Sequence, residues 1–153
     1  MSRGKLYNVI EEAIRMYVDI LRIISNSGNL IYYRPKLNSL TGGNVIATIL
    51  LGQIIELWFE NGKQKFYKFK TRPGKPHRLY KDGESWCEEL GISSGMFDTA
   101  IKKIGFKFGK NRNALPKEKA YIWYYTDDER VTWYMVNEDL LYRKLAEIYG
   151  RGE

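Results

Sequence analysis

Cysteine and histidine are nearly absent from the sequence, and their scarcity excludes several kinds of protein. Cys87 is the single cysteine and His77 the single histidine among 153 residues. One cysteine cannot form a disulfide within the chain, so disulfide-stabilised scaffolds are excluded. A zinc site built from several Cys and His ligands is excluded for the same reason. A lone cysteine fits a reducing compartment, and we expect no bound metal and no cofactor.

Long apolar runs are missing as well. The first 24 residues are interrupted by seven charged side chains, namely Arg3, Lys5, Glu11, Glu12, Arg15, Asp19 and Arg22. No stretch of signal-peptide length remains between them. The longest uncharged run, residues 37–55, contains polar side chains and glycines and is too polar to span a bilayer. We therefore expect a cytoplasmic protein with no membrane partner.

Common catalytic motifs are also lacking. The sequence has no Walker A pattern and no GxSxG elbow, and one histidine cannot supply the paired histidines of rolling-circle nickases. The neighbouring acids Glu88–Glu89 and Asp127–Asp128 have no evident base or metal partner, although distant acids could still form a two-metal site. The sequence predicts a protein that is not an enzyme and has no evident small-molecule substrate.

What the chain does contain is enough apolar sequence for a core, and an excess of positive charge. Apolar residues make up 44% of the sequence, and a chain of about 150 residues can bury roughly two thirds of its unfolded surface. Lys and Arg number 25 against 18 Asp and Glu, which gives a net charge of +7. The excess is therefore moderate, and its placement along the chain carries more information than its size.

Two stretches are basic and contain no acidic residue. The first basic run, residues 61–81, holds Lys63, Lys65, Lys68, Lys70, Arg72, Lys75, Arg78 and Lys81. The second basic run, residues 102–117, holds Lys102, Lys103, Lys107, Lys110, Arg112 and Lys117. Because each neutralised phosphate releases condensed counterions, such runs favour a nucleic-acid partner. A solvated basic surface without a partner is the alternative.

Hydrophobic spacing predicts helices at both ends and in the middle of the chain. Residues 6–24 carry apolar side chains three or four positions apart, and residues 25–29 end that pattern. Residues 41–44 offer caps for a helix over 45–62 that is apolar nearly all round and should be central to the core. Residues 137–149 predict a final helix.

The remaining segments predict short strands and loops. Residues 30–36 are typical of an extended piece, with Pro35 at its edge or end, and residues 64–70 of a strand. Two prolines and a glycine make residues 71–76 a loop. Residues 120–126 and 130–136 alternate around an acidic turn and predict a β-hairpin.

Between these parts lie two short predicted helices joined by Gly91. The first spans about residues 85–90 and is anchored by Trp86, and the second begins with a Ser93 cap and ends at Gly105. The outward positions of the second helix are Ser93, Ser94, Gly95, Asp98, Thr99, Lys102 and Lys103. Small polar residues at the start and basic residues at the end suit insertion into a DNA major groove.

Residues 37–141 resemble winged helix-turn-helix DNA-binding domains, especially those of replication initiators and regulators carried by phages, plasmids and archaeal mobile elements. The resemblance rests on Gly91–Phe106 and the hairpin that follows. It implies a mainly helical α+β fold with a C-terminal hairpin wing and flanking N- and C-terminal helices. It also implies a second helix that reads the major groove through Ser93, Ser94, Thr99, Lys102 and Lys103.

Two features depart from that pattern, a long interval over residues 107–119 and an acidic hairpin tip. Since phosphate repels an acidic tip, we expect the loop 107–119 to make the auxiliary DNA contact, with Lys107, Lys110, Arg112 and Lys117. Arg72, Lys75 and Arg78 form a candidate second phosphate contact.

The chain is expected to consist of an N-terminal helix and extended segment (1–36), the winged domain (37–141), and the end of the last helix with the tail (142–153).

The predicted function is non-catalytic binding of double-stranded DNA, as a transcription regulator or replication-origin binder, by a homodimer paired through its terminal helices. Four alternatives stay open. The aromatic hairpin could stack unpaired bases, or its faces could be core and subunit contact. The fold could serve protein interaction only. The two short helices could also be an ordinary packed pair. The resemblance and the 12 tyrosines hint at a viral or plasmid source.

Overall fold

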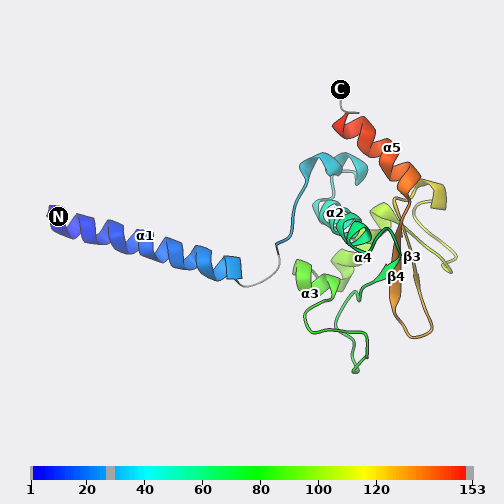
Figure 1. Cartoon of the computed structure of the whole chain (residues 1–153), viewed down its shortest axis with the longest axis horizontal. Helices are drawn as coiled ribbons and strands as arrows, with labels where there is room; N and C mark the ends of the chain where they lie inside the picture. The colour runs from blue at the N-terminus through cyan, green and yellow to red at the C-terminus, as the bar shows by residue number, and fades with distance from the viewer. Residues whose placement is uncertain (1, 27–29, 151–153) are drawn as a thin grey trace. The chain divides into compact units, whose positions relative to one another are not determined.

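The chain forms two compact units, residues 1–30 and 31–153, and the computed structural model describes residues 2–26 and 30–150. The first unit is a single helix, α1 (Arg3–Asn26), which confirms the helix predicted over residues 6–24 (Figure 1). Part of its predicted end, residues 27–29, lies outside the described residues. In the described ranges, no helix has both the length and the apolar character needed to cross a membrane.

The second unit combines helices with one small mixed sheet, so the predicted α+β class is confirmed (Figure 1). Its elements in chain order are the 3-10 helix η1 (Pro35–Leu40), α2 (Val45–Glu60), β1 (Phe66–Tyr67), α3 (Trp86–Leu90), α4 (Ser94–Ile104), β2 (Gly105–Lys107), the 3-10 helix η2 (Lys117–Lys119), β3 (Ile122–Thr126), β4 (Thr132–Val136) and α5 (Glu138–Tyr149). The four predicted helices of this unit and the hairpin are confirmed, with ends that differ by a few residues.

Three short segments differ from the prediction. An extended piece through residue 36 is wrong, because Pro35 begins η1, where its fixed φ suits the first turn. The strand predicted over 64–70 shrinks to β1, since only Phe66 and Tyr67 pair with β4. The parallel pairing of β2 with β3 has no counterpart in the sequence prediction. Three residues that directly follow a helix are too few to show a strand period.

The sheet has the strand order β1-β4-β3-β2, with antiparallel β1–β4 and β3–β4 pairs and a parallel β2–β3 pair. Side chains alternate between its two faces. The inner face contributes Phe66, Ile122, Tyr124, Tyr134 and Val136 to the core, all of them buried. The other face carries half-buried aromatic residues. Figure 1 shows α2, α3 and α4 on one side of β3 and β4.

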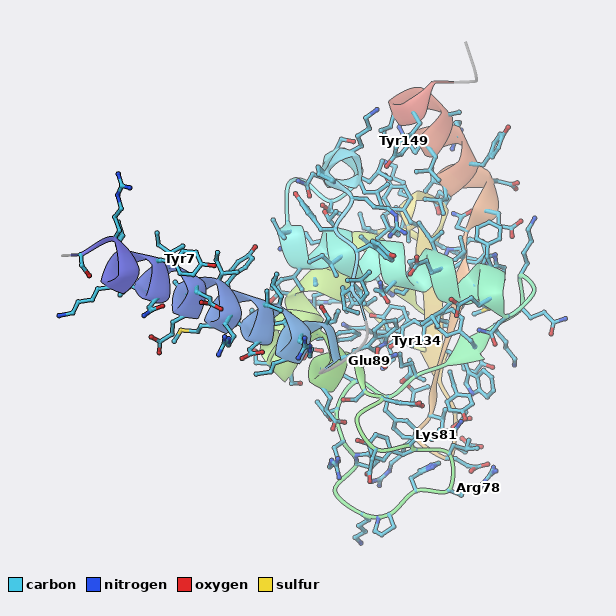
Figure 2. All side chains as sticks on the ribbon, turned by 60° about the vertical axis from the view of Figure 1, so that its left-hand side comes forward. Tyr7, Arg78, Lys81, Glu89, Tyr134 and Tyr149 are labelled. Atoms are coloured by element: carbon cyan, nitrogen blue, oxygen red, sulfur yellow. The ribbon has the colours of Figure 1, made fainter. Side chains whose placement is uncertain are left out.

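The core is built around α2, as its apolar circumference predicts. Leu50, Leu51 and Ile54 of this helix are fully buried, and α2 packs against both α4 and β4. Tyr134 lies in the interior, as Figure 2 shows, and only 1% of its surface is exposed. Full burial of an aliphatic side chain such as Leu50, Leu51 or Ile54 contributes roughly 1.5–3 kcal/mol to folding.

The two short helices, α3 and α4, begin and end at capping residues that can be recognised in the sequence. Ser85 caps α3 by accepting from the Glu88 amide, and Ser93 caps α4 by accepting from the Met96 amide. Between them, Gly91 has a left-handed backbone with φ of 65°, which glycine adopts without strain. The buried side of α4 consists of Phe97, Ala100, Ile101 and Ile104, so the opposite side faces outward.

We expect Gly105→Ala to lower the free energy of unfolding by about 1–3 kcal/mol, because overpacking forces neighbours to move. A Cβ atom here would lie 2.9 Å from Cε1 of Tyr124 and 3.0 Å from the Ile101 carbonyl oxygen. Gly95→Ala is the matched control within α4, since its Cβ would come no nearer than 4.0 Å to any atom outside its chain neighbours and the local helix backbone. Urea denaturation of both variants checks this, and equal stability of the two would contradict it.

Candidate nucleic-acid interface

The outward side of α4 presents most of the predicted groove-reading residues. Ser93, Ser94, Gly95, Thr99, Lys102 and Lys103 are all exposed. Asp98, on the same side, is half-buried and forms an ion pair of 3.2 Å with Lys70. The only acid on this side of the helix is therefore neutralised from the segment that follows β1. The surface that remains is small and polar at the helix start and basic at its end.

A groove of about 740 Å³ runs between α4 and the sheet. Its lining brings together three predicted site residues from three consecutive segments, namely Lys102 of α4, Lys107 at the end of β2 and Lys110 of the loop after β2. The inner-face rings of Tyr124 and Tyr134 lie at its floor. Folding thus places part of the second basic run around one concave surface, as binding of a polyanion requires.

Two of these lysines also border a neighbouring hollow of about 400 Å³, where Arg112 joins Lys102 and Lys110. The loop that carries Lys110 and Arg112 is held at its base by the Asn113 side chain. The amide of that side chain donates to the Lys107 carbonyl at 3.1 Å, and its oxygen accepts from the Lys107 amide at 2.9 Å. Lys110 and Arg112 lie between these two hydrogen-bonded residues in the chain and are exposed, so they project from a loop whose base is fixed.

The structure separates the two basic runs by their ion pairing. In the first basic run, four cations contact acids of this chain: Lys68 with Glu89, Lys70 with Asp98, Arg72 with Asp82 and Glu88, and Arg78 with Glu129. In the second basic run, Lys102, Lys103, Lys107, Lys110, Arg112 and Lys117 have no ion-pair partner among residues 2–26 and 30–150. Three of these six side chains, Lys102, Lys107 and Lys110, line the groove, whereas Lys117 lies over the Trp123 ring. The four other cations of the first run also have no ion-pair partner in the described residues, so the two runs differ in degree.

The predicted second phosphate contact is divided by this pairing. Arg72 is 3.2 Å from Asp82 and 3.3 Å from Glu88, and Arg78 is 2.8 Å from Glu129. Lys75 is exposed and has no ion-pair partner in the described part of the chain. Two of the three residues thus already bind carboxylates of this chain, and they lie away from the α4 groove on the loop before α3. Figure 2 labels Arg78 on that loop.

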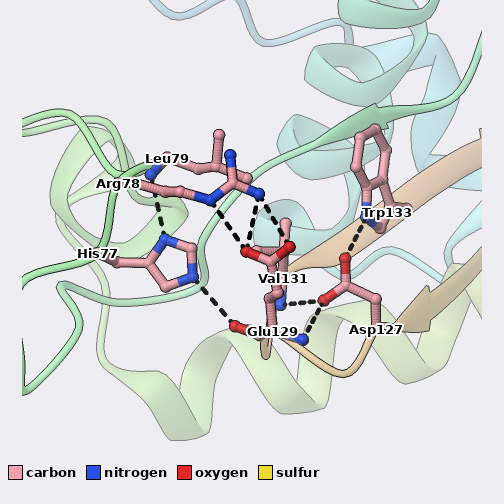
Figure 3. Close-up of polar contacts among 7 residues, drawn as sticks. All are labelled: His77, Arg78, Leu79, Asp127, Glu129, Val131 and Trp133. Carbon is pink, nitrogen blue, oxygen red and sulfur yellow. Dashed lines mark hydrogen bonds and ion pairs between the residues drawn. The ribbon is translucent and has the colours of Figure 1, made fainter.

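The hairpin tip is less acidic in the fold than in the sequence. Arg78 binds Glu129 through both carboxylate oxygens, at 2.8 and 2.9 Å from one guanidinium nitrogen (Figure 3). His77 Nδ1 accepts from the Leu79 amide at 3.1 Å, so the proton of the neutral ring lies on Nε2, which donates to the Glu129 carbonyl at 3.0 Å. The loop before α3 is thereby fastened to the β3–β4 hairpin.

Asp127 organises the turn of the hairpin rather than presenting a free charge. Its carboxylate accepts from Trp133 Nε1 at 2.9 Å and from the amides of Glu129 and Val131 at 2.9 and 3.0 Å (Figure 3). The Trp133 bond first, and the Val131 amide next, hold the pKa of Asp127 below its usual range. These bonds stabilise the charged form, so the turn depends on an ionised Asp127.

A second carboxylate ties the loop before α3 to that helix. Glu88 accepts hydrogen bonds from Tyr80, from Ser85 at 2.8 Å and from Arg72 at 3.3 Å. Those bonds, the Tyr80 bond foremost, lower the pKa of Glu88, while burial of the Tyr80 phenol raises its pKa. Glu88 is thus a structural anchor, which accounts for its place in an acidic pair without a catalytic partner.

Sequence reasoning misses several residues that the fold adds to this surface. Lys70 and Tyr124 line the groove, and the hydroxyls of Thr126 and Thr132 hydrogen-bond at 2.9 Å on its sheet side. Strand parity could have placed Tyr124 on the same face as Tyr134, because they oppose each other in the β3–β4 pair. The pairing of Lys70 with Asp98 spans 28 residues and leaves no local signal.

Stability should fall less steeply with acidification in Asp127→Asn than in the natural sequence. Because the folded pKa of Asp127 is depressed, its stabilising effect is full above the unfolded pKa of about 3.9 and is lost as the pH falls through the folded value. Thermal unfolding between pH 6 and pH 2.5 measures the slope. Asp128→Asn, which removes a neighbouring charge but leaves the three turn bonds intact, should keep the original slope.

Other chemistry is limited at this surface. No group of three His, Cys, Asp or Glu side chains within the described ranges is arranged to hold a metal ion. Burial raises the pKa of the Cys87 thiol, which disfavours the reactive thiolate.

Comparisons of the chain with protein-family models, with curated proteins and with solved structures give no match. What the interface can bind follows from its own shape and charge.

Proposed function

We propose that residues 37–141 form a winged helix-turn-helix domain that binds double-stranded DNA without catalysis, as a transcription regulator or a replication-origin binder. In this arrangement α4 enters the major groove, and the loop 107–119 contacts the phosphate backbone beside it. The observation that supports the proposal is that four cations of the second basic run line two adjoining hollows beside α4 without an ion-pair partner in the described residues, whereas four of the eight cations of the first basic run pair with acids of the chain.

The order of elements supports the winged reading. Helix α2 is followed by β1, the pair α3 and α4 joined at Gly91, and the β3–β4 hairpin. In the sheet, β4 lies between β1 and β3, so the hairpin returns beside the first strand. A winged helix-turn-helix needs this order, because the sheet must support the second helix from behind while its outward side stays free. The added strand β2 extends the sheet on the α4 side.

The chemistry of α4 supports groove insertion. Its first turn carries Ser94 and Gly95, whose small side chains let the helix start approach base edges closely. Thr99 can contact bases or phosphates one turn later. Lys102 and Lys103 lie in the last turn and are exposed, where they can reach the backbone as the helix leaves the groove.

Fluorescence anisotropy with random duplex and single-stranded DNA at several salt concentrations tests this function. About six phosphate contacts should give a slope near −5 for log affinity against log salt. Selection from a random duplex pool should enrich a motif if α4 reads bases. Negligible binding to duplex at low salt would contradict the proposal and favour the protein-interaction alternative.

Reversing two charges in the loop, Lys110→Glu with Arg112→Glu, should weaken duplex binding by roughly 10- to 100-fold at 0.1 M salt. The salt slope should fall by about 2, since two phosphate contacts are lost. Both side chains are exposed, and neither takes part in the Lys107–Asn113 hydrogen bonds at the base of the loop, so the fold should tolerate the change. Anisotropy titrations measure the affinity and the slope.

The matched control for that variant is Lys81→Glu with Arg143→Glu. It changes the net charge equally at exposed positions outside α4 and the loop 107–119. A local phosphate contact predicts a small effect in this control and a large one in the loop variant. Equal effects in the two variants would mean that net charge, rather than a contact at the loop, governs binding.

The outer face of the sheet favours a second candidate, binding of single-stranded nucleic acid. Aromatic residues from four strands and the loop after β2 share this face, namely Tyr67, Phe106, Phe108, Trp123, Tyr125 and Trp133. Lys65 lies 5.0 Å from the Trp133 ring centroid, and Lys117 the same distance from that of Trp123. Because lysines already cover the Trp133 and Trp123 rings, unpaired bases would have to displace them in order to stack, and we therefore favour duplex DNA as the ligand. Tighter binding to single-stranded than to duplex DNA would reverse that preference.

A further inference from the structure

The first unit of the chain, taken by itself, is a helix without a core. Every side chain from Leu6 to Ile24 is apolar or tyrosine except for a polar set on one side, which comprises Asn8, Glu11, Glu12, Arg15, Asp19 and Arg22. At 3.6 residues per turn this polar set occupies an arc of only about 120°. More than half of the circumference is therefore apolar, and one helix cannot cover its own surface.

The apolar arc is exposed on α1 to an extent seen in no other described helix. Eleven large side chains, Leu6, Tyr7, Val9, Ile10, Ile14, Met16, Tyr17, Val18, Ile20, Leu21 and Ile23, are between 44% and 68% exposed. Most helices in proteins owe their stability to packing of an apolar face, and the β-branched residues of α1 lower its helix propensity. The stability of α1 therefore requires a partner surface that is itself apolar.

We propose that this partner is α1 of a second copy of the chain, so that α1 is a self-association element. Apolar residues recur at spacings of four and three through Leu6, Ile10, Ala13, Tyr17 and Ile20, as the seam between paired helices requires. Half-exposed side chains of this size present roughly 80–100 Å² each, so eleven offer on the order of 1,000 Å². The whole arc thus offers an area comparable with the about 800 Å² that each partner buries in a standard interface, and one partner helix covers the part that lies along the seam.

Charge favours a second copy over a lipid surface. Helix α1 carries four basic and three acidic side chains, a net charge of +1, so the remainder of the +7 lies elsewhere in the chain. Arg15 pairs with Glu11 at 3.4 Å and Arg22 with Asp19 at 3.9 Å within the helix. Two such helices can approach without strong repulsion, whereas helices that lie on anionic membranes are rich in Lys and Arg on the polar side.

The predicted homodimer pairs through both terminal helices, and the structure distinguishes these two helices. In α5, Leu140 and Leu141 are buried in the second unit, so its main apolar residues already have partners. Helix α1 is the terminal helix with an apolar arc that its own unit leaves uncovered. Self-association through α1 does not depend on DNA binding, and its test needs no nucleic acid.

The test is sedimentation of the full chain at micromolar concentration, for the natural sequence, for Ile10→Glu with Tyr17→Glu, and for the control Asn8→Glu in the polar arc. We expect a mass of at least twice 18.0 kDa for the natural sequence and for the control. The double variant should sediment at the monomer mass, with a smaller far-ultraviolet helix signal as the 24-residue α1 loses its partner.

Tryptophan fluorescence keeps the test interpretable. Trp58, Trp86, Trp123 and Trp133 all lie in the second unit, so an unchanged emission spectrum shows that this unit stays folded in the double variant. A monomer mass for the natural sequence would overturn the proposal, since α1 would then be covered within one chain or not at all. An unchanged oligomer mass in the double variant would overturn it equally, because the interface would lie elsewhere.

Discussion

The packing of Tyr134 is the interaction on which the rest of the second unit depends. Its ring lies 5.7 Å from Phe66, 5.8 Å from Tyr124 and 5.8 Å from Trp86, measured between ring centroids. These partners come from β1, β3 and α3, and Trp86 in turn stacks on Phe97 of α4 at 6.4 Å. One aromatic cluster thus joins the sheet to both short helices. Because interiors are close-packed, a shift of this ring would displace the surface of α4 as well.

Internal ion pairing decides which basic residues are left to meet a partner. Lys70 and Arg78 look equivalent to Lys102 and Lys110 in the sequence, but they are drawn to Asp98 and Glu129 by the fold. Exposed pairs of this kind add little stability. Their larger effect is on the electrostatic field, because the Arg78 pair cancels charge at the hairpin turn and the Lys70 pair neutralises the one acid on the outward side of α4. A basic composition becomes a directed surface by this means.

The two units meet different demands. The second unit buries its apolar residues against its own sheet and helices and leaves a charged concave surface. The first unit is a helix whose apolar arc has no counterpart within that unit. Joining a surface suited to one DNA half-site with an element suited to pairing copies is a physically economical arrangement, because two linked sites bind more tightly than either alone. Both roles are proposals, and each has its own readout.

Local signals in the sequence determined the helices and the hairpin. The serine caps, the glycine at the α3–α4 turn, the apolar stripe of α4 and the alternation of β3 and β4 act over a few residues, so periodicity and capping rules predict them. The exposed side of α4 could be read in the same way, since its buried positions follow helical spacing. The α+β class follows from these elements together.

Only the tertiary structure decided the features that join distant segments. The short parallel strand β2 exists because Gly105–Lys107 lies beside β3, and the groove exists because the loop after it folds back next to α4. The pairing of Arg78 with Glu129 spans 51 residues, and that of Lys70 with Asp98 spans 28. Contacts over such separations depend on the whole fold, because no local pattern in the chain records which distant partner a charged side chain will meet.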